Sequence, residues 1–248
     1  MQTNPRPVDV LAVGAHPDDV ELGCAGTLAK MIASGVSVGI LDLTAGEMGT
    51  RGDKETRLRE SHKAAEILGA TFRACFFMPD TRVEKNETDE KRLVGLIRTV
   101  RPRILLAPVG QDTHPDHCAA ALLVDSAWYK AGFGKYDCPQ KPFRPERLVR
   151  YMLGQDLPPS FVVDISAHID QRHAAVMAYE SQFFHDRSAQ FEGKTRLATP
   201  QFQDLLDTRL KYYGSRILKA YGEPFLIKEL TEIDHPARLS DERSIFKD

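Results

Sequence analysis

Residues 8–30 read VDVLAVGAHPDDVELGCAGTLAK, and this stretch decides the fold. Residues 8–14 form a short apolar run, and residues 20–34 have the periodicity of a helix. A near-continuous apolar run predicts a strand that is covered on both faces, and a helix directly after it predicts a βαβ crossover. The polar residues 16–19 fall at the junction between the strand and the helix.

The same alternation repeats along the chain. Apolar runs follow at 37–43, 72–77 and 103–109, separated by helical stretches at 54–69, 88–101 and 115–131. Further on, the sequence predicts strands at 148–153 and 160–164, helices at 166–182 and 200–219, and a surface loop at 184–199. We therefore expect one α/β domain over residues 1–248, with a Rossmann-like, open, mostly parallel sheet and helices on both faces.

The composition is that of a globular protein with a locally recognised small ligand. Of 248 residues, 42% are hydrophobic and 27% charged, and 33 basic against 35 acidic residues give a net charge of −2. This balance argues against a nucleic-acid or membrane partner. The N-terminus lacks a secretory pattern, and the four cysteines form no CxxC pair, so we expect reduced thiols in the cytoplasm.

Two unusual polar clusters follow predicted strands. His-Pro-Asp-Asp at 16–19 comes directly after the first strand, and His-Pro-Asp-His at 114–117 follows the fourth after a short loop. In open parallel sheets ligands bind outside the carboxyl ends of the strands, so both clusters lie where a site is expected. In each cluster a His-Pro turn opens a helix, with a metal-capable side chain three residues after the histidine.

The clusters predict one catalytic metal site. His16, Asp19 and His117 supply two imidazoles and one carboxylate, which leaves positions open for water and substrate. Zinc suits this set because it acidifies bound water and polarises a carbonyl, and Fe²⁺ suits the same ligands. Asp18 is placed to accept the proton of the water, and His114 to stabilise the oxyanion or protonate the leaving amine.

The two clusters also have structural and other functional interpretations. A histidine at a strand end is often structural and an aspartate that begins a helix is often an N-cap, but two such clusters at neighbouring strand ends favour function. A dinucleotide-binding oxidoreductase is disfavoured because Gly14, Gly23 and Gly26 do not form G-x-G-x-x-G. A non-haem iron oxygenase and a catalytically inactive sugar-binding module stay open, although a free Asp18 favours hydrolysis.

The motifs resemble the LmbE/PIG-L family of N-deacetylases. The resemblance rests on GAHPDDVELGCAGTLAK (14–30), LTAGEMGTRG (43–52), RLRESHKAAEILG (57–69), MPDTR (78–82), HPDH (114–117) and AYESQF (178–183). It implies the fold predicted above and the same roles, with His16, Asp19 and His117 as zinc ligands, Asp18 as general base and His114 as acid or electrostatic stabiliser.

Substrate residues are expected on the other strand-end loops. The resemblance suggests that Arg57 and Asp80 hold a glucosamine ring, and the loop positions add Arg51, Arg82 and Glu47, since arginines and carboxylates bind sugar hydroxyls and acids. Some relatives carry a tyrosine just before HPDH, where this chain has the sequence Gln-Asp-Thr at 111–113.

The resemblance is greatest to the branch that deacetylates N-acetylglucosaminyl-L-malate in bacillithiol biosynthesis. We therefore expect hydrolysis of the acetamide of that small molecule, with another N-acetylglucosaminide, such as a chitin disaccharide, as the alternative. A local group of arginines in a nearly neutral protein favours an acidic aglycone. We also expect a homo-oligomer such as a hexamer, and His185 as a further candidate substrate contact from the 184–199 loop.

Overall fold

A computed structural model describes residues 5–183, 191–230, 232 and 234–235, so His185 lies outside the described residues. The strands are β1 (Val10–Gly14), β2 (Val38–Thr44), β3 (Phe72–Met78), β4 (Ile104–Pro108), β5 (Arg147–Tyr151), β6 (Phe161–Asp164) and β7 (Gly222–Ile227). The helices are α1 (Asp19–Ala33), α2 (Lys54–Leu68), α3 (Glu87–Val100), α4 (Pro115–Ala131), α5 (Ile169–Met177) and α6 (Pro200–Ser215).

The described residues form a seven-stranded sheet in the order β3-β2-β1-β4-β5-β7-β6. The first five strands along the chain pair in parallel, and β7 runs antiparallel to both β5 and β6. The expected open, mostly parallel α/β sheet is confirmed. From β1 the chain moves outward through β2 to β3 and then returns to β4, so the topological switch point lies between β1 and β4.

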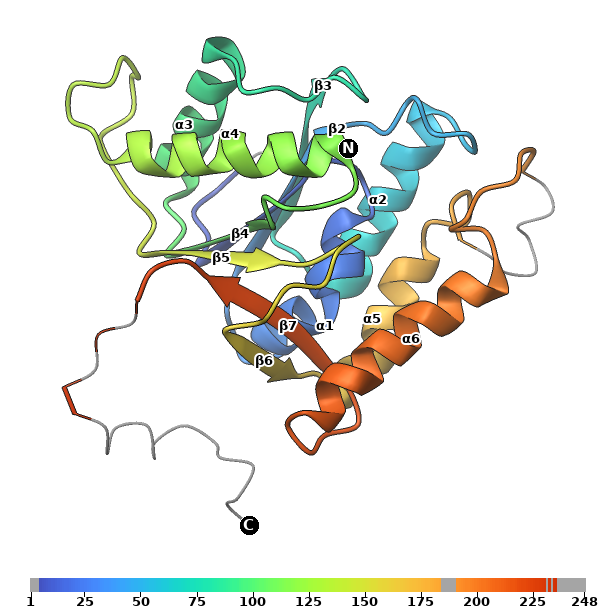
Figure 1. The fold of residues 1–248 in the computed structure, drawn as a ribbon. Helices are drawn as coiled ribbons and strands as arrows, with labels where there is room; N and C mark the ends of the chain where they lie inside the picture. The colour runs from blue at the N-terminus through green and yellow to red at the C-terminus, as the bar shows by residue number, and fades with distance from the viewer. Residues whose placement is uncertain (1–4, 184–190, 231, 233, 236–248) are drawn as a thin grey trace.

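Helices cover both faces of the sheet (Figure 1). Leu11 and Val13 of β1 belong to a core that includes apolar residues of α3 and α4. Val10 and Ala12 belong to a second core, with residues of α1, α2 and α5. Successive residues of a strand point to opposite faces, and both faces of β1 are buried, which is why its sequence is a continuous apolar run rather than an alternating one.

The second half of the chain departs from expectation in three places. The expected helix at 166–182 is a 3₁₀ turn (Ser166–His168) followed by α5, which already ends at Met177. Strand β7 was not predicted at all. Helix α1 is kinked at Cys24, and the buried Glu223 of β7 accepts hydrogen bonds from the N–H groups of Gly26 and Thr27 after the kink. That carboxylate thus caps a helical segment nearly two hundred residues away.

The helices and the cysteines bear on the expectations about membranes and disulfides. Among the described residues, every helix is too short or too polar to cross a membrane. All four cysteines are free thiols rather than disulfides, as their spacing predicted.

Candidate metal and catalytic site

The HPDD turn after β1 holds its two aspartates in different ways. Asp18 is the N-cap residue of α1, yet its side chain makes no capping hydrogen bond and its backbone is left-handed, with φ 104°. A non-glycine residue in that region costs about 1–3 kcal/mol, and such strain concentrates at functional sites. Asp19 begins the helix and accepts the His16 N–H at 2.9 Å. The N-cap interpretation therefore does not account for the Asp18 carboxylate.

The HPDH turn opens α4 beside it. His114 is the N-cap of α4, and its Nδ1 accepts the Asp116 N–H at 3.2 Å. Parallel pairing of β1 with β4 brings the two turns together. The ring of His114 lies 4.8 Å from that of His16 and 4.7 Å from that of His117, centre to centre. Direct contacts thus connect four of the five predicted metal and catalytic residues, namely His16, Asp19, His114 and His117.

Asp19 lies between the two histidines predicted to be its fellow ligands. Its Oδ2 is 3.5 Å from Nδ1 of His16, and its Oδ1 is 3.2 Å from Nε2 of His117. One nitrogen from each ring therefore faces the same carboxylate. All three residues are buried, with at most 9% of each exposed.

The opposite ring nitrogens lie against other carboxylates. Nε2 of His16 is 3.1 Å from Asp116 Oδ2 and 3.2 Å from Asp80 Oδ1, and Nδ1 of His117 is 3.1 Å from Asp112 Oδ1. A carboxylate partner favours the proton on the nitrogen it contacts and leaves the lone pair on the other nitrogen. This is the arrangement in which carboxylates orient metal-binding histidines.

The residues present fit a divalent cation. Burial opposes protonation of His117, but Asp19 and Asp112 outweigh it and raise the His117 pKa to about 10. Burial likewise opposes protonation of His16. Hydrogen bonds with Asp116, Asp19 and Asp80 outweigh burial and raise the pKa of His16 well above its usual value. The carboxylates therefore create a negative potential at these rings, which favours a bound dication, and binding of the cation would release the ring protons.

The described residues contain two groups of three side chains that could bind a metal ion. Within each group, the possible ligand atoms all lie within 4.8 Å of one another. One joins nitrogens of His16, His114 and His117, and the other joins His16 with Asp80 and Asp116. Both include His16, which is the centre of the cluster. Asp19 contacts His16 and His117 of the first group. The expected ligand set therefore has two residues in common with this group and a third in contact with both.

Asp18 is held by Arg57 of α2. Nη2 of Arg57 donates to the Pro17 carbonyl and lies 3.3 Å from Asp18 Oδ2. Burial raises the pKa of Asp18 to about 7, which the positive charge of Arg57 partly opposes and the neighbouring Asp19 reinforces. A carboxyl group with a pKa near neutrality is suited to accept and return a proton at physiological pH.

The remaining predicted substrate residues occupy different places. Glu47 accepts the Asp80 N–H at 2.9 Å, so it adjoins the cluster. Arg51 is only 4% exposed, and its guanidinium lies 5.6 Å from the centre of the Phe191 ring. Arg82 is exposed, two residues after Asp80. Asp80, Glu47 and Arg57 therefore adjoin the cluster, whereas Arg51 lies against Phe191 and Arg82 is exposed.

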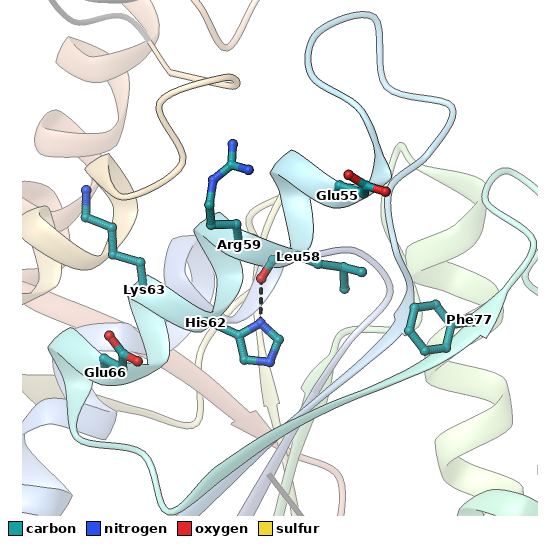
Figure 2. A pocket seen from close by; sticks show the side chains of 7 residues that line it. All are labelled: Glu55, Leu58, Arg59, His62, Lys63, Glu66 and Phe77. Atoms are coloured by element: carbon teal, nitrogen blue, oxygen red, sulfur yellow. Dashed lines mark hydrogen bonds between the residues drawn. The ribbon is translucent and has the colours of Figure 1, made fainter. Parts of the chain in front are cut away.

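A cavity of about 570 Å³ lies elsewhere, on the outer side of α2 near the end of β3. Its lining side chains include Glu55, Arg59, Lys63 and Phe77 (Figure 2). His62, in the same cavity, is 2.6 Å from the Leu58 carbonyl through Nδ1. None of the predicted site residues lines this cavity. The candidate site is therefore identified by its possible metal ligands and not by this cavity.

Comparison with known proteins agrees with this cluster. The PIG-L family, described as GlcNAc-PI de-N-acetylase, matches residues 11–128. A diacetylchitobiose deacetylase of Thermococcus kodakarensis is 32% identical over 189 residues, which cover 71% of each chain. The chain belongs to the PIG-L family. It is a deacetylase, and therefore a hydrolase, of the N-acetylglucosamine type.

Two solved structures have the same fold. A conserved protein from Thermus thermophilus is 40% identical with a TM-score of 0.82, covering 92% of this chain and 98% of its own. An N,N'-diacetylchitobiose deacetylase from Pyrococcus horikoshii is 25% identical with a TM-score of 0.77, covering 88% and 82% respectively.

Sequence reasoning missed two carboxylates that contact the predicted ligands of this PIG-L deacetylase. Asp116 stands inside HPDH and Asp112 just before it, and both contact ring nitrogens of predicted ligands. A signal was available, because metal-binding histidines almost always have a hydrogen-bonding partner on the second nitrogen. The sequence does not tell which nearby acid pairs with which ring.

We expect Asp112→Asn to weaken zinc binding by about 10–100-fold, since the amide no longer fixes the His117 ring as a carboxylate does. Competition with a chromophoric chelator measures the affinity. Asp207→Asn is the matched control, because Asp207 lies 2.8 Å from His173 Nε2 outside the cluster. That variant should bind zinc like the unmodified protein.

The same titration tests the ligand set. Alanine at His16, Asp19 or His117 should lower zinc affinity more steeply than Asp112→Asn does, because an incomplete three-ligand site loses most of its binding energy. Full zinc occupancy in all three alanine variants would contradict the assignment.

Proposed function

We propose that this protein hydrolyses the acetamide of a small N-acetylglucosaminide and releases acetate and the free amine. The observation that carries the proposal is the position of Asp19 between Nδ1 of His16 and Nε2 of His117, with each opposite nitrogen against a carboxylate. We propose zinc as the metal, and Fe²⁺ suits the same ligands. A zinc ion bound there would acidify a water molecule and polarise the acetamide carbonyl.

Asp18 is the proposed general base. Its carboxylate takes a proton from the attacking water, and its pKa of about 7 suits that step. Arg57 holds the carboxylate in place through Nη2. When the C–N bond breaks, Asp18 returns the proton to the leaving nitrogen, so that an amine departs and the carbonyl carbon leaves as acetate.

His114 is proposed to stabilise the oxyanion. Because its Nδ1 accepts the Asp116 N–H, its ring proton belongs on Nε2. Burial, and then the nearby charges of His16 and His117, lower the pKa of His114, which favours this neutral form. A neutral ring with a proton on Nε2 can donate to negative charge on the former carbonyl oxygen. Of the two roles expected for His114, this hydrogen-bonding role is the better supported.

The other function classes have less support. The turn after β1 is filled by acidic residues, which disfavour a dinucleotide pyrophosphate at the start of α1. A base beside the metal ligands favours hydrolysis over oxygen chemistry, and the complete set of five residues supports catalysis over sugar binding alone.

The proposed substrate is N-acetylglucosaminyl-L-malate, as an intermediate of bacillithiol biosynthesis. Arg57 contacts Asp18 and Pro17, and Arg51 is buried. Of the three arginines, we therefore propose Arg82 as the residue that binds an acidic aglycone. Arg82 is exposed and follows by two residues Asp80, which lies 3.2 Å from His16 Nε2. A chitin disaccharide is the second candidate, favoured by the 32% identical relative that acts on diacetylchitobiose.

We also propose a cytoplasmic homo-oligomer, such as a hexamer. Four free thiols are typical of a reducing compartment. Leu122 and Tyr129, more than half exposed on α4, offer apolar surface that a second copy would cover.

Asp18→Asn should retain zinc and the fold but lower kcat by about 10²-fold or more, the scale of a lost general base. His114→Ala should lower kcat similarly while zinc stays bound, because His114 acts on charge that develops in the transition state. Amine release and metal content are measured on the same samples. If Asp18→Asn loses the metal while Asp19→Asn keeps metal and activity, the two aspartates have the opposite roles.

The aglycone is tested by comparing kcat/KM for N-acetylglucosaminyl-malate, free N-acetylglucosamine and diacetylchitobiose. Arg82→Gln should cost the malate substrate about 10-fold, the effect of a lost hydrogen bond to a charged group, and the neutral sugars much less. Arg147→Gln is the control, since Arg147 is exposed at the start of β5, the opposite end of the strands. If diacetylchitobiose is the better substrate and Arg82→Gln affects all three sugars alike, the malate assignment is withdrawn.

A further inference from the structure

The AYESQF motif at 178–183 forms an irregular segment after α5 whose polar side chains bind three different elements. Tyr179 Oη donates to Glu21 of α1 at 3.1 Å, and Ser181 donates to Glu60 of α2 through both its N–H and its hydroxyl at 2.7 Å. Ser181 and Tyr179 are fully buried. The segment is therefore a fixed support, anchored to two helices that border the site.

The third contact of this segment reaches the loop 46–52, between β2 and α2. Nε2 of Gln182 donates to the Arg51 carbonyl at 2.7 Å and also to Ser181 Oγ at 2.8 Å. Gly52 has φ +73°, and a Cβ there would lie 2.8 Å from Ser181 Oγ. The loop thus approaches the segment as closely as glycine allows, and Gln182 supplies the hydrogen bond that fixes it there.

The other end of the same loop is bonded to the metal cluster. The Met48 N–H donates to Asp80 Oδ2 at 2.8 Å, and Glu47 Oε1 accepts the Asp80 N–H at 2.9 Å. Asp80 in turn lies 3.2 Å from Nε2 of His16. Loop 46–52 therefore contacts Gln182 at one end and Asp80, a partner of His16, at the other.

We propose that Gln182 is a positioning residue that sets the place of loop 46–52 and, through it, the affinity for the sugar. The inference rests on the proposed function for its kinetic consequence. Gln182 is 7% exposed and Arg51 is 4% exposed, so a variant without this donor removes a buried hydrogen bond between the segment and the loop, and the loop is held less tightly. A shift of the loop moves Glu47, a predicted substrate residue of the loop, whereas His16, Asp19 and His117 are held by the turns after β1 and β4.

The test compares Gln182→Met with Gln171→Met. Gln171 is a matched control, because its Nε2 also donates to a backbone carbonyl, that of Ile67, at 2.8 Å, but at the far end of α2. Gln182→Met should raise KM for N-acetylglucosaminyl-malate about 10-fold, with kcat within about 3-fold and zinc content unchanged, while Gln171→Met changes none of these. Gln182→Glu, which keeps the size but replaces the donor, should behave like Gln182→Met.

Amide hydrogen exchange supplies a readout that does not depend on activity. The loop amides at 46–52 should exchange faster in Gln182→Met than in Gln171→Met, and the shorter Gln182→Asn serves the same comparison if the methionine variant does not fold. Unchanged KM and unchanged loop exchange would overturn the proposal, as would loss of zinc. If the unmodified enzyme cleaves no N-acetylglucosaminide, the proposed function fails, and the exchange data alone still decide whether Gln182 positions the loop.

Discussion

Val10, Leu11 and Ala12 of β1 pair in parallel with residues 104–106 of β4, and the site depends on that pairing. The two strands are almost a hundred residues apart in the chain, yet their carboxyl ends meet at the switch point of the sheet. Without this register HPDD and HPDH would be two unrelated helix starts. With it, three imidazoles from the two turns lie within 5.5 Å of one another, centre to centre.

Carboxylates then determine what the imidazoles can do. Asp116, Asp80 and Asp112 contact the far nitrogens of His16 and His117, so the near nitrogens are turned toward Asp19. The same acids also serve the loops, since Asp116 accepts the N–H groups of residues 81 and 83. Ligand orientation and loop position therefore depend on shared side chains, which is why residues remote from the metal can act on the substrate.

The sequence predicted β1 to β6 because apolar runs are local signals, and it placed the five candidate residues in two His-Pro turns that the fold brings together. It missed β7 because Pro224 lies within it, and proline normally argues against a strand that pairs on both sides. The sequence did not predict the early end of α5, because no glycine or proline marks it. Beyond that end, Tyr179 and Ser181 form hydrogen bonds with other helices. Arg57 was expected at the sugar, and the fold also places it against Pro17 and Asp18, a pairing that only the tertiary structure creates.

The central claim is the location of the metal, and the most direct measurement is an anomalous difference map, recorded at the zinc edge from crystals of the zinc-loaded protein. The account predicts one strong peak in contact with Nδ1 of His16, Nε2 of His117 and the Asp19 carboxylate. A peak on the other side of the His16 ring, between Nε2 and the carboxylates of Asp80 and Asp116, would contradict it.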